Sequence, residues 1–139
     1  MKERVFLDTN VLVYLFDADE PAKQQRARTL LSNQELRDQV TLSTQVLQEF
    51  YVSVTRKLAV PLDPDTALKA VQDLAVFPII QIDTPLILLA IQRSRKATVS
   101  FWDALILEAA LVAGTTLLYS EDFQDGASFG KLRIANPFR

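Results

Sequence analysis

The chain has 139 residues, of which 49% are hydrophobic and 23% charged, and its formal net charge is −2. This composition is typical of soluble globular proteins and excludes disordered, collagen-like and fibrous chains, and the length fits a single domain over residues 1–139. Cysteine and histidine are both absent, which excludes disulfides, thiolate catalysis, cysteine zinc sites and histidine general bases. Any chemistry must therefore use carboxylates, hydroxyls, amides, lysine or arginine.

No segment approaches the ~20 consecutive apolar residues that cross a bilayer, and the N-terminus lacks an apolar signal segment with a small-residue cleavage site. We therefore expect a cytoplasmic protein without a membrane partner. The isoelectric point near 5.1 gives no overall attraction to nucleic acid. Basic residues gather only locally, as at Arg56 and Lys57, and such pairs taken alone are typical of solvated helix faces.

Short apolar runs predict strands buried on both faces, which are typical of parallel sheets. In chain order they are Val5–Leu7, Val40–Leu42, Ile79–Ile82, Leu117–Tyr119 and Leu132–Ile134. Helical patterns separate them, at 22–33, 46–58, 64–76, 85–96 and 101–113. Strands that alternate with helices imply right-handed crossovers, and hence an α/β fold with a parallel sheet covered on both faces.

Capping signals mark several of these helices. Asp63-Pro64 and Thr84-Pro85 each predict a cap followed by a proline in the first helical position. Ser100 and Gly114 predict the start and the stop of the segment 101–113. That segment is apolar almost all round, so we expect it to be the most buried helix.

Two acidic residues follow predicted strands. Asp8 comes directly after the first strand, and Asp122 lies just beyond the strand at 117–119, with Glu121 and Asp125 beside it. In an open parallel sheet these positions are at the carboxyl edge, where ligands bind. A helix cap or Asx turn at Asp8, with Thr9 or Asn10 as the alternative cap, and a solvated turn at Asp122 remain the structural alternatives.

Two further acids lie on helices. Asp103 has apolar neighbours on both sides, so its carboxylate needs a polar cleft or a cation, although an acidic residue three positions after Ser100 also suits a helix start. Glu49 alone is typical of a solvated helix face. Beside it runs a polar row on the same helix: Gln45, Glu49, Ser53 and Arg56. If this row borders the cleft, Arg56 meets a substrate phosphate while Glu49 meets a metal.

Together the four acids predict a shared metal site, since four neighbouring carboxylates do not all stay ionised without cations. The site requires the strands carrying Asp8 and Asp122 to be neighbours where the strand order reverses, with Glu49 and Asp103 supplied by adjoining helices. Oxygen ligands of this kind suit Mg²⁺, for which Mn²⁺ can substitute, and these ions bridge to substrate phosphates.

The motifs resemble those of PIN-domain nucleases, in particular the VapC-type toxins of bacterial toxin–antitoxin pairs. The resemblance spans nearly the whole chain and rests on four stretches in order: Phe6–Leu12, Gln48–Phe50, Trp102–Ile106 and Ser120–Phe123. Each motif alone has low specificity, whereas the ordered set at these separations is specific.

The resemblance implies a three-layer α/β/α sandwich around a central parallel sheet and a Mg²⁺-dependent endoribonuclease that hydrolyses RNA phosphodiester bonds. It further implies a homodimer and a small antitoxin that blocks the cleft. The family's acidic positions correspond to one set of residues here: Asp8, Glu49, Asp103 and Asp122. Asn10 is the accompanying polar residue of the first motif, and Asp125 is a possible extra metal ligand.

Two other functions remain open. A phosphatase with an aspartyl nucleophile also has Asp after the first parallel strand. Such enzymes generally have a second acid two residues later, where this chain has Asn10. A non-catalytic PIN-like module that binds RNA or a protein would use the same acids only as caps and solubilising charges. Metal titration distinguishes the binding module from the nuclease. A phosphate-ester assay distinguishes the phosphatase from the nuclease.

Overall fold

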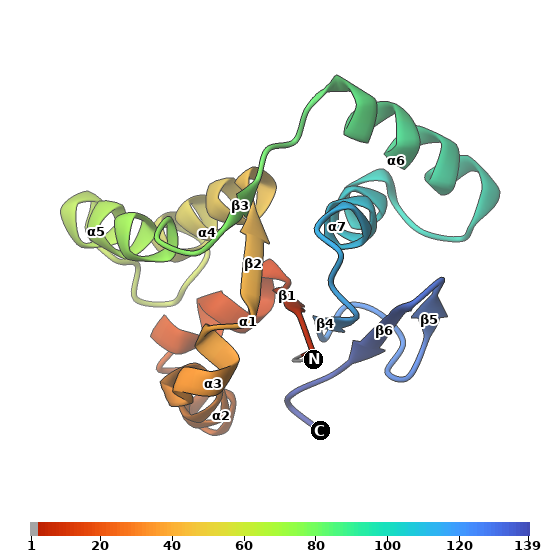
Figure 1. Ribbon diagram of the computed structural model, residues 1–139. Coiled ribbons are helices and arrows are strands. Elements are labelled where there is room, and N and C mark those ends of the chain that lie inside the picture. The colour runs from red at the N-terminus through yellow and green to blue at the C-terminus, as the bar shows by residue number, and fades with distance from the viewer. Residues whose placement is uncertain (1–2) are drawn as a thin grey trace.

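The computed structural model describes residues 3–139 and contains one six-stranded sheet (Figure 1). Its strands are β1 (Val5–Leu7), β2 (Val40–Ser43), β3 (Ile79–Ile80), β4 (Leu117–Tyr119), β5 (Ser128–Phe129) and β6 (Leu132–Ala135). The strand order is β3-β2-β1-β4-β6-β5, and all neighbours are parallel except β5 and β6. The sheet is therefore largely parallel, as predicted.

Helices cover both faces of the sheet. They are α1 (Thr9–Val13), the 3₁₀ helix η1 (Tyr14–Phe16), α2 (Pro21–Ser32), α3 (Gln34–Arg37), α4 (Thr44–Arg56), α5 (Pro64–Leu74), α6 (Thr84–Lys96) and α7 (Phe101–Val112). In Figure 1, α1 to α5 lie on one side of β1 and β2, and α6 and α7 lie on the other. This arrangement confirms the predicted three-layer α/β/α sandwich.

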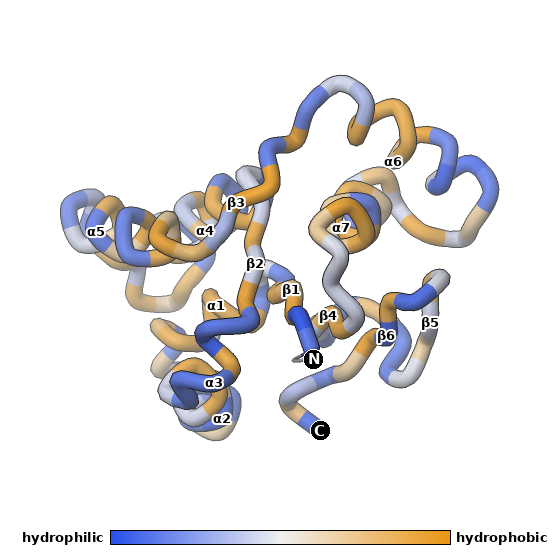
Figure 2. Tube along the Cα trace, viewed as in Figure 1, coloured by the Kyte–Doolittle hydropathy of each residue, from blue (hydrophilic) through white to orange (hydrophobic). Residues whose placement is uncertain are grey.

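The central strand β1 is completely buried because it pairs with β2 on one side and β4 on the other. Both faces of a strand in that position meet helices, which explains why its sequence is continuously apolar rather than alternating. Figure 2 shows the same pattern, with hydrophobic residues along the inner strands and around α7 and hydrophilic residues on the outer surfaces of α2 and α3.

Helix α7 is the most buried helix, as its sequence predicts, with an unbroken buried stretch from Ala104 to Ala110. The Ser100 hydroxyl caps its start by accepting a hydrogen bond from the Asp103 N–H at 3.1 Å. Gly114 follows its end with φ of 73°, a left-handed conformation that glycine adopts without strain. The one buried acid of this stretch, Glu108, forms a salt bridge with Arg93 and so ties α6 to α7.

Several boundaries differ from the sequence predictions. Thr84 is the first residue of α6 rather than its cap, because the Asp83 side chain accepts the hydrogen bond from the Leu86 N–H. The strand predicted over Ile79–Ile82 is limited to two half-buried residues, since β3 is an edge strand with a neighbour on one side only. The antiparallel strand β5 was not predicted.

Among residues 3–139, no helix has both the length and the apolar character needed to span a membrane.

Candidate active site

The two strands that carry Asp8 and Asp122 are neighbours. Residues Leu7 of β1 and Tyr119 of β4 are paired in parallel register, so both chains leave the sheet side by side. The strand order also reverses here, because β2 and β3 lie on one side of β1 and β4 and β6 on the other. This edge is where open α/β sheets bind ligands, so the topology that the sequence prediction required is present.

Asp8 lies in this crevice with only 3% of its surface exposed. One carboxylate oxygen accepts a hydrogen bond from the Thr9 N–H at 2.7 Å, and the other accepts one from the Ser120 hydroxyl, also at 2.7 Å. Asp8 is thus the N-cap of α1, the alternative that its sequence position left open. Burial raises the pKa of Asp8 from 3.8 to about 7, since the two hydrogen bonds only partly oppose it and the charges of Asp122 and Glu49 add to it.

Glu49 is half-buried on α4 and reaches the same crevice. It accepts hydrogen bonds from the Thr9 hydroxyl at 2.7 Å and from the Gln45 amide at 3.3 Å. The same Gln45 amide donates to the backbone carbonyl of Trp102 at 3.1 Å, next to Asp103. Gln45 therefore links the helix that carries Glu49 to the helix that carries Asp103.

Asp103 is half-buried in the first turn of α7. Burial raises its pKa, the negative charge of Asp122 raises it further, and Glu49 adds a smaller effect, while a hydrogen bond with Ser100 opposes them. Asp103 therefore belongs to the helix start and also lies near other carboxylates.

Asp122 is exposed at the mouth of the crevice. Its carboxylate accepts a hydrogen bond from the Asn10 amide at 3.0 Å, and its backbone N–H donates to the Ser120 hydroxyl at 3.0 Å. The Asn10 carbonyl oxygen also accepts from the Glu121 N–H at 3.4 Å. Asn10 therefore holds the loop after β4 against the start of α1.

Two candidate residues lie apart from this group. The carboxylate of Asp125 accepts a hydrogen bond from the Asn136 N–H at 2.8 Å, which directs it toward the C-terminal segment. Arg56 is exposed, and the neighbouring Lys57, not Arg56, lines the hollow beside Asn10 and Asp122.

In the part of the chain that the structure describes, the four acids of the site form no salt bridge. The nearby Lys23 is paired with Glu121 at 3.0 Å. In the same part of the chain, no group of three or more carboxylates is arranged so as to hold one metal ion. The oxygen donors nevertheless fit Mg²⁺, which is usually bound through one or two carboxylates and keeps several waters.

Three residues that sequence reasoning did not select organise the site: Thr9, Gln45 and Ser120. Ser120 is fully buried although it is a hydroxyl residue directly after a strand. Gln45 is buried on the polar row of α4. The available signals were the place of Ser120 directly after a buried strand and the place of Gln45 one helical turn before Glu49.

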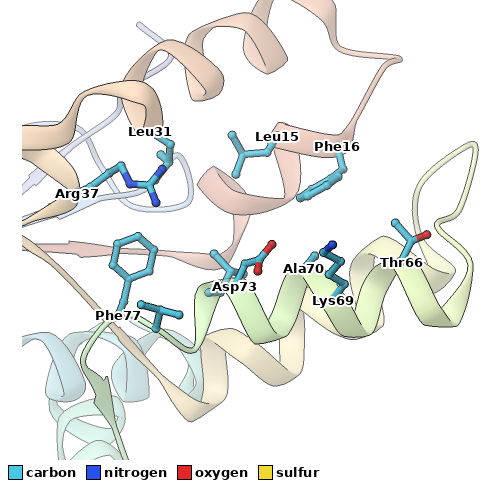
Figure 3. A pocket seen from close by; sticks show the side chains of 11 residues that line it. Leu15, Phe16, Leu31, Arg37, Thr66, Lys69, Ala70, Asp73 and Phe77 are labelled. Atoms are coloured by element: carbon cyan, nitrogen blue, oxygen red, sulfur yellow. The ribbon is translucent and has the colours of Figure 1, made fainter.

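The site has a hollow on each side of Asp122. One of about 300 Å³ extends past Asn10 to the end of α4, and one of about 310 Å³ extends past Asp103 to Phe129. A larger hollow of about 510 Å³ lies elsewhere, between η1 and α5 (Figure 3). Its walls include Leu15, Phe16 and Phe77 and none of the four acids, so it is not part of the crevice.

Comparisons with known proteins give one family. The family model for the PIN domain matches residues 5–125. No curated protein matches the chain.

Several solved structures share the fold. The sarcin–ricin loop cleaving toxin VapC20 of Mycobacterium tuberculosis has a TM-score of 0.68 and 22% identity, over 93% of this chain and 98% of that chain. A toxin–antitoxin complex from Klebsiella pneumoniae has a TM-score of 0.70 and 19% identity, over 96% of this chain and 97% of that chain. DNA-bound VapBC from Salmonella typhimurium has a TM-score of 0.64 and 18% identity, over 98% of this chain and 99% of that chain. At these identities the similarity establishes the fold.

The raised pKa of Asp8 makes stability depend on pH. The folded chain binds more protons than the unfolded chain between about pH 4 and pH 7, so the free energy of unfolding falls as pH rises through this window and is level above it. Asp8→Asn removes the charge, so in a chelating buffer at pH 8 we expect it to raise this free energy by up to about 4 kcal/mol. Urea unfolding from pH 4 to pH 8 measures the effect.

The control for this measurement is Asp19→Asn, which neutralises an exposed acid outside the crevice and should leave the pH profile unchanged. A profile of Asp8→Asn that falls between pH 4 and pH 7 as steeply as that of the wild type would show that another group controls the stability.

Proposed function

Because the chain belongs to the PIN domain family, we propose that it is a Mg²⁺-dependent endoribonuclease and the toxin of a toxin–antitoxin pair. The observation that carries the proposal is the buried Asp8 carboxylate, which has no cationic partner within residues 3–139 and is surrounded by further acids. A protein that keeps such a charge at the ligand-binding edge of its sheet needs a cation there.

We assign the metal to the crevice that Asp8, Glu49, Asp103 and Asp122 border. Bound Mg²⁺, or Mn²⁺ in its place, lowers the pKa of a water and neutralises charge on phosphate oxygens. The chain's own residues hold and orient the ligands, since Ser120 and Thr9 fix the Asp8 oxygens and Thr9 and Gln45 fix Glu49. Without histidine, RNA cleavage through the 2′-hydroxyl lacks its usual acid and base, so we expect hydrolysis that leaves a 5′-phosphate.

The solved complexes that share this fold contain antitoxins, which supports a small antitoxin as partner. We assign its docking to the hollow of about 510 Å³, which is bounded by apolar side chains of η1 on one wall and α5 on the other (Figure 3). Arg37 and Lys69 add two positive charges there against the one negative charge of Asp73, which favours an apolar segment with acidic neighbours.

The face of α6 that α7 does not cover supports self-association. Leu88, Leu89 and Ile91 are 54%, 44% and 40% exposed there, and neighbouring exposed apolar residues of this kind mark interaction surfaces. We propose a homodimer through this face.

The nuclease assignment predicts that Asp8→Asn loses Mg²⁺-dependent cleavage of RNA by about 100-fold or more, because loss of a metal ligand should cost at least as much as loss of a residue that orients one. Cleavage of an end-labelled RNA pool, with sequencing of the new 5′ ends, measures the loss and the product chemistry. The control is Asp19→Asn, an exposed acid outside the crevice.

Metal binding provides a readout that does not need the substrate. Millimolar Mn²⁺ should raise the melting temperature of the wild type by mass action and should leave that of Asp8→Asn unchanged. Full cleavage by Asp8→Asn would refute the nuclease assignment. Binding of RNA without a Mn²⁺ shift would favour the non-catalytic module, and turnover of phosphate monoesters would favour the phosphatase.

For the antitoxin, Ala70→Glu places a charge in the large hollow and should abolish co-purification of the protein encoded by the neighbouring gene while leaving RNA cleavage intact. Leu68→Glu is the matched control, since Leu68 lies on the same helix, is exposed and does not line the hollow. Equal co-purification by both variants would place the antitoxin elsewhere.

For the homodimer, sedimentation of the wild type should give a molecular mass twice that of one chain. Sedimentation of Leu88→Glu should give the mass of one chain. The matched control is Leu68→Glu, which introduces the same charge at an exposed leucine of α5. A wild-type monomer, or a dimer that survives Leu88→Glu, would overturn the proposed interface.

A further inference from the structure

A cation at the end of α4 indicates how the substrate lies. Glu49, Ser53 and Lys57 are spaced by four residues, and Lys57, the C-cap residue of α4, keeps helical backbone angles, so the three residues lie on one face on successive turns. Glu49 lies in the acidic crevice. Ser53 and Lys57 line the hollow that begins at Asn10 and Asp122, which one further acid, Asp17, also borders. The sequence favoured Arg56 for contact with phosphate, whereas in the structure the neighbouring Lys57 lines the hollow and Arg56 does not.

Lys57 is available for a ligand. Within residues 3–139 its ammonium group has no salt bridge, and neither it nor the Ser53 hydroxyl has a side-chain hydrogen bond. The other lysine near the site, Lys23, is held by Glu121 and by the Tyr14 hydroxyl. A free cation and a free hydroxyl beside a nuclease-like site suit a phosphate of the substrate backbone.

The hollow on the other side of Asp122 has a different character. Two half-buried aromatic side chains, Phe123 and Phe129, line it, with their ring centroids 6.5 Å apart. Gln124 lies on its exposed rim, and no side-chain hydrogen bond within the described residues occupies its amide. Aromatic walls with one amide suit an unstacked nucleobase, because aromatic rings contact its face and amides read its edge.

We propose that these two hollows bind single-stranded RNA on either side of the scissile phosphate. Lys57 and Ser53 hold a backbone phosphate on the side of α4, and the hollow of Phe123 and Phe129 receives a base whose edge Gln124 contacts. This inference rests on the proposed nuclease function and adds the path of the RNA strand across the site. The hollow at Lys57 recognises the charge of the backbone, and the hollow at Gln124 recognises the identity of a base.

The first experiment tests Lys57 by binding of fluorescent single-stranded oligoribonucleotides in a chelating buffer, where no cleavage is needed. Lys57→Ala should weaken binding about 10-fold for every sequence, and the slope of log affinity against log salt should fall by about 0.7 for one lost phosphate contact. Arg56→Ala removes the same charge one residue away and should change affinity less than two-fold. Lys57→Arg should retain most of the affinity.

The second experiment tests the base hollow with oligoribonucleotides that differ at single positions. Gln124→Ala should reduce the preference for one base at one position by about five-fold or more and leave the salt dependence unchanged. Gln72→Ala, an exposed glutamine on α5, is its control. A uniform loss of affinity in Gln124→Ala, or no change in preference, would overturn the base-reading half.

The outcomes separate this inference from the nuclease proposal. Binding that depends on Lys57 in a protein that cuts no RNA would support the strand path and refute the nuclease. Wild-type protein that binds no single-stranded RNA, or equal binding by Lys57→Ala and wild type, would overturn the strand path. A Lys57→Ala variant that loses only the antitoxin would assign the hollow to the protein partner and also overturn it.

Discussion

The constraint on which the structure depends is the burial of one carboxylate, Asp8, without a counter-ion. A charge in that position costs free energy, and the two hydrogen bonds from Ser120 and Thr9 offset only part of it, so its pKa is raised to about 7. The neighbouring acids increase the cost. The fold therefore gives up stability at neutral pH at the carboxyl edge of its sheet, a local violation of good packing chemistry that is typical of functional sites.

Around Asp8, two residues, Thr9 and Gln45, each form hydrogen bonds to two different parts of the site. Thr9 contacts Asp8 through its backbone and Glu49 through its hydroxyl, and Gln45 joins Glu49 to the first turn of α7. Because these hydrogen bonds connect α1, α4 and α7, a shift of any one of the three helices changes the position of a carboxylate. Rigid helix starts and short strands therefore fix the spacing of the acids.

The sequence predicted some residues of the site better than others. The strand ends predicted Asp8 and Asp122, and the apolar neighbours of Asp103 predicted its polar crevice, whereas Glu49 was selected mainly by family resemblance. Arg56 and Lys57 lie seven and eight residues after Glu49, and both spacings return to the same helix face, so only coordinates separate them. Similarly, Asp83 and Thr84 are both good caps, and the two-residue strand β5 has too little pattern to detect.

The pairing of β1 with β4 also has a consequence for synthesis. The hydrogen bond from Ser120 to Asp8 joins residues 112 positions apart, and it is made possible by the pairing of the adjacent strands β1 and β4. A chain synthesised from its N-terminus contains Asp8 and Glu49 well before the loop that follows β4. The crevice therefore cannot form around Asp8 until residues 120–122 have been synthesised.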